Sequence, residues 1–299
     1  NLTAKALGNV KSTTLGSLSR KENDYDYVAS NQLKAILYEG TVLAQSASGT
    51  KESVEAIKLE DVKAFLAEHL VSSRLMIAIG GDLNEALVNE QLQKILDAMP
   101  KGSDEPLVSY EVRKEAKEVI LKRETEQAYI YFGSPFHIKE SDSDYYKSRV
   151  AAFILGAGGF GSRLMEEIRV KRGLAYSAYG RINASQSNSH FSGYLQTKIE
   201  SLEEAQKTVR DVIADFVKNG VSKEELEQTK KFMLGSEPLR VETMSQRLNR
   251  TLMEFYKGQE FGHSAKELEL IKGLSLKELN EFIASHVEIN DLSFAIVTK

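Results

Sequence analysis

The chain has 299 residues, enough for about two domains of roughly 150 residues each. Hydrophobic residues make up 41% and charged residues 27%, close to globular averages, which excludes a disordered or fibrous chain. The 39 Lys and Arg residues against 43 Asp and Glu residues give a net charge of −4, which argues against sequence-independent nucleic-acid binding. The chain has no cysteine, so disulfides, thiolate zinc sites and cysteine nucleophiles are excluded.

Apolar runs are short. The longest, such as residues 150–155 and 75–79, are far below the ~20 residues of a membrane-spanning helix, so we expect no membrane span. The chain opens with Asn1 and carries no charged-then-apolar signal segment. We therefore expect that processing or truncation has set this start.

The first predicted elements lie in residues 59–79, where apolar residues at helical spacing precede a short turn and an apolar strand. This segment aligns without gaps onto residues 276–296, at an offset of 217 positions. Identical pairs, such as Phe65 with Phe282 and His69 with His286, fall in both the helical and the strand part. The alignment predicts a duplicated unit, whose first copy lacks about a hundred residues at its N-terminal end.

Between the two copies, residues 83–99 predict an amphipathic helix, and the polar, proline-containing stretch after Pro100 predicts a linker. Further strands, helices and a hairpin follow in the second copy. They are strands at 118–123 and 127–133, helices at 143–155 and 162–172, a hairpin of strands at 174–184 and 190–198, and helices at 202–218, 223–235 and 242–257. Asn219-Gly220 ends the first of these last three helices, and Ser222 with Glu225 forms a capping box for the second.

This grouping of strands and helices predicts an α+β fold of tandem homologous domains, each a mainly antiparallel sheet with helices on one face. We expect residues 1–100 to be the C-terminal part of the first domain, truncated at its N-terminus. Residues 101–117 are then a linker, and residues 118–299 a complete second domain.

Gly156, Gly158 and Gly161 satisfy the dinucleotide fingerprint G-x-G-x-x-G, but a helical pattern precedes them where the fingerprint needs a strand. No acidic residue ends a following strand about 20 residues on. The glycines therefore predict a connection between two helices and not a nucleotide site.

The five histidines are scattered and include no i,i+4 pair, so we expect them at helix ends or on the surface. They are His69, His137, His190, His263 and His286. His69 and His286 fall at equivalent helix C-termini, where a positive charge favours the helix dipole. No G-x-S-x-G motif supports a serine nucleophile.

Residues 158–181, GGFGSRLMEEIRVKRGLAYSAYGR, predict a short amphipathic helix ended by Gly173 and then a strand. Arg169 lies near the end of this helix and Tyr176 at the start of the strand, so both side chains could face one cleft. On physical grounds alone, a solvated arginine and a cross-strand aromatic explain the same pattern.

This stretch closely resembles the C-terminal-domain signature of the pitrilysin/insulinase-type (inverzincin) metallopeptidases, which include the mitochondrial processing peptidases. In that family a G-G-x-x-S-R-L turn, here Gly158, Gly159 and Gly161 onward, precedes a helix and an R-x-x-x-G-L-x-Y-type sequence. The resemblance extends to residues 37–54 and 217–236. The family consists of tandem homologous α+β domains, in agreement with the repeat.

Family members hydrolyse peptides with zinc held by H-x-x-E-H and by a further glutamate on a later helix. The resemblance places H-x-x-E-H before residue 1 and the further glutamate at Ser17, which is not a plausible zinc ligand. The nearest carboxylate, Glu22, would need a shift of five residues. We therefore expect no metal and no catalytic residue in this chain, with zinc in an active family partner.

The Arg–Tyr pair that the family's second domain contributes is present as Arg169 and Tyr176. In related enzymes the pair approaches the substrate from the domain opposite the zinc, in an oxyanion-type role. Two-chain versions of the family place zinc on one subunit and the Arg–Tyr pair on the other. The resemblance therefore implies an inactive, substrate-binding subunit that completes the active site of a zinc-bearing partner.

Two alternatives remain open. The chain could be a fragment of a self-sufficient zinc endopeptidase whose H-x-x-E-H lies upstream, or a non-proteolytic scaffold subunit like the family's members in respiratory complexes. Expected partners are a zinc-bearing paralogous subunit or a second copy of the chain, together with extended or unfolded peptides. Such peptides could add a strand to the edge near residues 174–184. Bacterial relatives of this size favour the periplasm or cell envelope, with the cytoplasm as the alternative.

Overall fold

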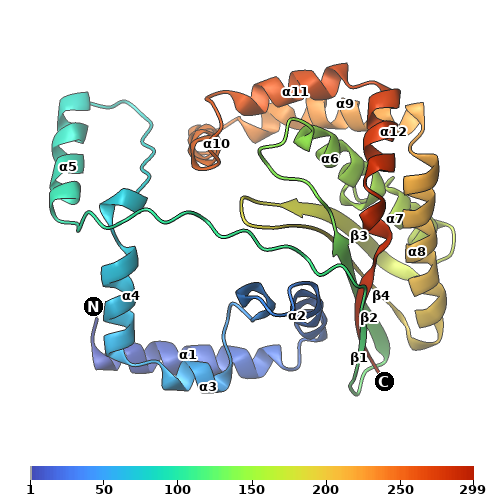
Figure 1. Ribbon diagram of the computed structural model, residues 1–299, viewed down its shortest axis with the longest axis horizontal. Coiled ribbons are helices and arrows are strands. Elements are labelled where there is room, and N and C mark those ends of the chain that lie inside the picture. Colours follow the sequence, from blue (N-terminus) through green and yellow to red (C-terminus); the bar gives the residue numbers. More distant parts are fainter. Residues whose placement is uncertain (1) are drawn as a thin grey trace. The chain divides into compact units, whose positions relative to one another are not determined.

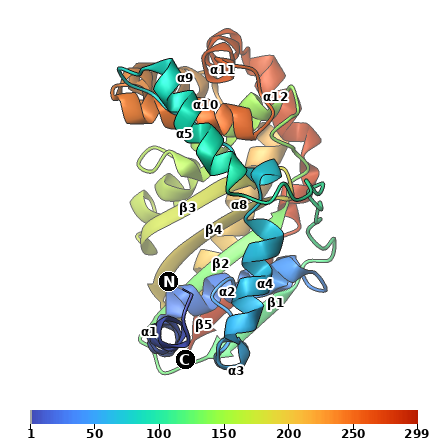
Figure 2. The same ribbon diagram turned by 90° about the vertical axis from the view of Figure 1, so that its left-hand side faces the viewer.

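The computed structural model describes residues 2–299, which form helices and a five-stranded sheet (Figures 1 and 2). The helices are α1 (Ala4–Lys21), α2 (Tyr25–Leu37), α3 (Lys51–Ala56), α4 (Leu59–His69), α5 (Glu85–Asp97), α6 (Tyr145–Ala152), α7 (Arg163–Met165), α8 (Leu202–Asn219), α9 (Lys223–Arg240), α10 (Met244–Tyr256), α11 (His263–Gly273) and α12 (Leu276–Ser285). The strands are β1 (Glu118–Lys122), β2 (Gln127–Pro135), β3 (Ala175–Ala184), β4 (Ser189–Lys198) and β5 (Ser293–Thr298).

The residues divide into two compact units, each assembled from separated segments. Unit 1 consists of Asn1–Arg20, Ala47–Leu107 and Ser236–His263, and unit 2 of Lys21–Ser46, Val108–Gly235 and Ser264–Lys299. All five strands belong to unit 2. These units do not test the predicted division into duplicated domains, which stays a prediction.

The sheet has the strand order β1-β5-β2-β4-β3. Only β1 and β5 are parallel, while the other neighbours are antiparallel. Helices α6, α7, α8 and α12 cover one face of this sheet (Figure 1). The predicted α+β class, a mainly antiparallel sheet packed against helices, is therefore confirmed.

The main core lies between this helical layer and the sheet. Ala128, Ile130 and Phe132 alternate along β2 and are completely buried on this side. Helix α8 presents Val209 and Ile213 to the same core, because its apolar residues recur every three or four positions. Burial of each such side chain contributes about 1.5–3 kcal/mol, so this face anchors unit 2.

The prediction that helices cover only one face of the sheet is wrong. Helix α2 packs on the opposite face, against β2 and β5. Its buried residues Leu33, Ile36 and Leu37 form a second core with Ala295. Both faces of β5 are consequently buried along its whole length. Helix α2 also reaches β4, where Gln196 Nε2 donates to Asp26 Oδ2 at 2.6 Å.

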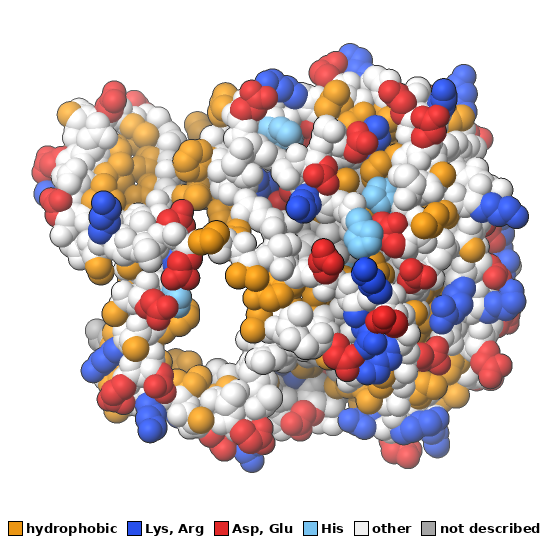
Figure 3. All heavy atoms as spheres, viewed as in Figure 1, with side chains coloured by type: hydrophobic (Ala, Val, Ile, Leu, Met, Phe, Trp, Pro, Cys, Tyr) orange, Lys and Arg blue, Asp and Glu red, His pale blue; other side chains and the backbone are white. Residues whose placement is uncertain are grey.

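The predicted strand at 75–79 is also wrong. These residues are irregular, and Leu75, Met76, Ile77 and Ile79 are 36–45% exposed. A strand needs neighbours for its backbone hydrogen bonds, and no strand among residues 2–299 pairs with this segment. Hydrophobic side chains also gather at the surface over α5 (Figure 3), where Leu87 is 56% exposed. Among the described residues, no helix combines the length and apolar character that a membrane crossing requires.

Candidate functional site

The glycine-rich turn has a defined shape between two helical segments. It connects the π-helical turn Phe153–Ala157 to α7. Gly159 and Gly161 have φ values of +65° and +94°, which L side chains rarely adopt. A Cβ at Gly158 would lie 2.8 Å from the carbonyl oxygen of Phe153, so glycine is required there too. The predicted connection between helices is therefore present, and it carries Phe160, which is 72% exposed.

Arg169 and Tyr176 lie together, as the sequence suggested. Arg169 is on the π-helical turn Glu166–Val170, and Tyr176 is at the start of β3. The guanidinium carbon of Arg169 lies 4.4 Å from the ring centroid of Tyr176 and 4.6 Å from that of Phe160. Arg169 is thus held between two aromatic rings, a favourable cation–π arrangement.

The N–H groups of the Arg169 guanidinium remain available for hydrogen bonds to a ligand. Arg169 is half-buried, and its guanidinium makes no hydrogen bond or ion pair with residues 2–299. Tyr176 is 82% exposed. The rings fix the position of the guanidinium without using its N–H groups, so the arrangement can donate hydrogen bonds to an oxygen that carries negative charge.

Arg163 fixes the helix that carries Arg169. Its Nε and Nη2 donate to the carboxylate of Glu225 at 2.7 and 2.9 Å, and Nη2 also donates to the carbonyl oxygen of Gly220 at 2.7 Å. Glu225 is at the same time part of the predicted capping box, since Ser222 N–H donates to Glu225 Oε2 at 2.7 Å. The corner between α8 and α9 is therefore tied to the helix beside the glycine turn.

Ser17 lies in the interior of α1, and Glu22 is exposed just after it. A neutral serine hydroxyl does not replace a carboxylate as a zinc ligand. No group of three or more His, Cys, Asp or Glu side chains within residues 2–299 is arranged to hold a metal ion. The described residues therefore do not fit a zinc site.

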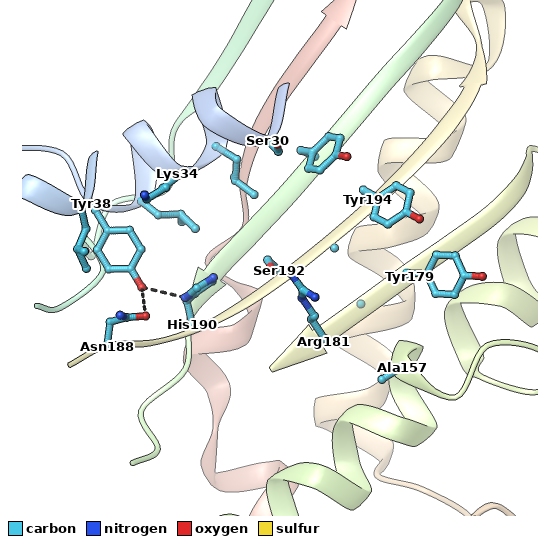
Figure 4. A pocket seen from close by; sticks show the side chains of 16 residues that line it. Ser30, Lys34, Tyr38, Ala157, Tyr179, Arg181, Asn188, His190, Ser192 and Tyr194 are labelled. Carbon is cyan, nitrogen blue, oxygen red and sulfur yellow. Dashed lines mark hydrogen bonds between the residues drawn. The ribbon is translucent and has the colours of Figure 1, made fainter. Parts of the chain in front are cut away.

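A cavity of about 750 Å³ opens on the sheet face between α2 and β3 (Figure 4). Tyr131, Tyr194 and Tyr179 stand side by side on β2, β4 and β3, with centroids of neighbouring rings 5.4 and 5.5 Å apart. Arg181 and Ser192 are register partners on β3 and β4 and line the same floor. Residues Ser30, Lys34 and Tyr38 line it from the side of α2.

His190 lies inside this cavity wall and contradicts the expectation of a helix-end or surface histidine. Tyr38 Oη donates to Asn188 Oδ1 at 3.1 Å and lies 2.8 Å from His190 Nδ1. Asn183 Nδ2 lies 3.3 Å from His190 Nε2. Burial, together with the positive charge of Arg181, lowers the pKa of His190 to about 4. The imidazole is therefore neutral at pH 7, with both ring nitrogens in hydrogen bonds.

Sequence reasoning missed two parts of these sites. Phe160 is not predicted, although an aromatic residue inside the matched glycine motif is a usable sequence signal. The tyrosine row was missed because Tyr131, Tyr179 and Tyr194 become neighbours only through strand register.

A mainly antiparallel sheet packed against helices is the fold that the resemblance to the pitrilysin-type peptidases implies. The sequence profile described as "Peptidase M16 inactive domain" matches residues 56–233, more than half of the chain. The chain belongs to this family.

Relatives with this similarity carry different names. The "Non-peptidase homolog YmxG" of Helicobacter pylori is 45% identical over 298 residues, covering 100% of this chain and 69% of that protein. The "Uncharacterized zinc protease YmxG" of Bacillus subtilis is 23% identical and covers 97% of this chain and 67% of that protein. A crystal structure of a peptidase M16 inactive domain from Pseudomonas fluorescens superposes with a TM-score of 0.91 at 25% identity, covering 99% of this chain and 70% of that one.

Proposed function

We propose that this chain is a non-catalytic, peptide-binding member of the M16 family that completes the active site of a zinc-bearing partner. The observation that carries the proposal is the Arg169 guanidinium, which two exposed aromatic rings hold in place without consuming its donors. The description of the matching family as an inactive domain and the name of the Helicobacter relative support a non-catalytic role.

In the proposed complex, zinc and its activating glutamate belong to the partner, which is a paralogous subunit or a second copy of this chain. Arg169 and the hydroxyl of Tyr176 donate to the carbonyl oxygen of the scissile peptide as that oxygen gains charge. An extended peptide adds a strand to β3, which is an edge strand of the sheet. Backbone hydrogen bonds to such an edge tolerate many sequences, as general peptide binding requires.

The test is peptide hydrolysis by the co-purified complex with a zinc-bearing paralogue. We expect Arg169→Gln to lower kcat by about 10²–10³-fold, the loss typical for one oxyanion donor. Tyr176→Phe keeps the ring against Arg169 and removes only the hydroxyl, so we expect a smaller loss. Arg172→Gln is the matched control, because Arg172 is an exposed arginine three residues away that pairs with Glu167.

Unchanged hydrolysis in the Arg169→Gln complex would remove the proposed role. Two further results would favour the alternatives over this proposal. Stoichiometric zinc and cleavage by the full-length chain alone would show a self-sufficient peptidase, whereas absence of peptide binding by any assembly would leave a scaffold role. We keep the bacterial periplasm or cell envelope as the proposed location, which cell fractionation tests.

A further inference from the structure

The cavity between α2 and β3 contains a cation without a partner. The guanidinium of Arg181 makes no hydrogen bond or ion pair with residues 2–299. The other cation that lines the cavity, Lys34, donates from Nζ to the carbonyl oxygen of Gln45 at 3.2 Å. No Asp or Glu is among the residues that line the cavity. The charged side chains among the lining residues are therefore those of Lys34 and Arg181, while the nearby Asp26 accepts hydrogen bonds from Tyr131 and Gln196.

The neighbouring polar groups define what Arg181 can bind. His190 is neutral, and its two nitrogens face Tyr38 and Asn183, so it offers no charge. The hydroxyls of Tyr179 and Tyr194 have no partner within residues 2–299. A guanidinium fork suits a carboxylate, which accepts two parallel hydrogen bonds from arginine.

The position of Arg181 indicates that this carboxylate belongs to a peptide. Arg181 and Tyr179 are two residues apart on β3 and present their side chains to the same face, beside the edge of the sheet (Figure 4). A peptide strand added to β3 would direct every second side chain to this face. Side chains directly opposite each other on paired strands are about 4.5–5.5 Å apart at Cβ, within reach of an arginine.

We propose that this cavity is a carboxylate subsite through which the chain prefers peptides with an Asp or Glu opposite Arg181. The tyrosine row beside it provides ring faces for the side chain two positions along the peptide. The subsite rests on the proposed peptide-binding role and adds a sequence preference that backbone hydrogen bonds alone do not give.

The experiment measures binding of two fluorescent peptides to the full chain by anisotropy. The peptides are extended, about ten residues long, and identical except for one central Glu or Gln. We expect the Glu peptide to bind about tenfold more tightly, as one charge-assisted pair gives about 1.4 kcal/mol. Arg181→Gln should bring the two dissociation constants together, and Arg181→Lys should retain part of the difference.

The control is Arg123→Gln, which removes the same charge from an exposed arginine without an ion pair, next to β1 at the other edge of the sheet. It should keep the full preference. The ratio of the two dissociation constants does not depend on the fraction of folded protein, so partial misfolding cannot imitate the result. Equal binding of both peptides to the unchanged chain would overturn the subsite and leave the peptide-binding role intact. Failure of both peptides to bind would overturn both proposals.

Discussion

Segments 59–79 and 276–296 have the same sequence pattern but different structures. Both begin with a helix, α4 and α12, and both continue into a 3-10 turn, Ser72–Arg74 and Val287–Asn290. After the turn, the second segment forms β5 between β1 and β2. The first remains irregular. Helix and turn therefore follow the local pattern in both segments, while the strand appears in only one.

The burial of equivalent residues differs in the same way. Phe65 on α4 is 61% exposed, whereas Phe282 on α12 is 6% exposed. Ile79 is 44% exposed, whereas Ile296 on β5 is completely buried. A helix closes its hydrogen bonds within four residues, but a strand depends on distant segments that supply neighbours in register. The comparison separates what a sequence encodes locally from what its surroundings provide.

We expect the largest difference in stability between substitutions of the equivalent residues Phe282 and Phe65. Phe282→Ala removes a ring from the core beside Phe136, so we expect a loss of about 3–5 kcal/mol in the free energy of unfolding. Phe65→Ala removes an exposed ring, and we expect a loss of less than about 1 kcal/mol. Urea unfolding monitored by amide hydrogen exchange measures the free energy of unfolding of each unit separately. Equal losses would mean that Phe65 is buried as deeply as Phe282, which would contradict the comparison.

Local signals predicted much of unit 2. The alternation at 127–133 predicted β2, the polar turn between two apolar runs predicted the β3–β4 hairpin, and Ser222 with Glu225 predicted a cap that the hydrogen bonds confirm. Each signal depends on residues within about four positions of one another. The motif around Arg169 and Tyr176 was found for the same reason, because its two residues are close in the sequence.

The features that the sequence did not predict depend on contacts between residues far apart in the chain. Helix α2 covers β5 across about 260 residues of chain, and no local pattern indicates that pairing. The bond from Arg163 to Glu225 and the burial of His190 under Tyr38 likewise depend on tertiary packing. The spacing of apolar residues in α2 predicts a helix but does not name the surface that it covers.

We expect a smaller difference in stability between substitutions of the equivalent residues His286 and His69. His286 Nδ1 lies 2.8 Å from Glu288 Oε1, and its ring stacks on Phe136 with centroids 4.3 Å apart. His286→Ala should therefore cost about 1–2 kcal/mol. His69 lies 2.8 Å from Arg74 Nη1 in an exposed setting, so His69→Ala should cost less than about 0.5 kcal/mol. Thermal unfolding of both variants measures the difference, and a larger loss in His69→Ala would reverse the comparison.

The smallest effect is a pH dependence that only the second segment can have. Burial alone would raise the pKa of Glu288, but hydrogen bonds from His286 and from the His137 backbone N–H outweigh it and hold the pKa below its ordinary value. At the equivalent position the first segment has Val71, which does not titrate.

The direction of the change in stability with pH follows from proton uptake. When the pH falls below about 4.5, the unfolded chain protonates Glu288 before the folded chain does, which favours unfolding. The stabilisation by Glu288 is therefore present above that pH and is lost as the pH falls through the lower, folded pKa. Glu288→Gln should remove about 1 kcal/mol of this acid-sensitive stability, so its unfolding free energy should fall less steeply with acidification.

Urea unfolding between pH 3 and pH 7 measures this slope. Glu126→Gln, at an exposed carboxylate in the turn between β1 and β2, should keep the slope of the unchanged chain. If Glu288→Gln also kept the slope of the unchanged chain, the Glu288 carboxylate would have the same pKa in the folded and the unfolded state. Because the first segment has Val71 in place of Glu288, the hydrogen bonds that Glu288 accepts from His286 and from the His137 N–H are the feature that this titration isolates.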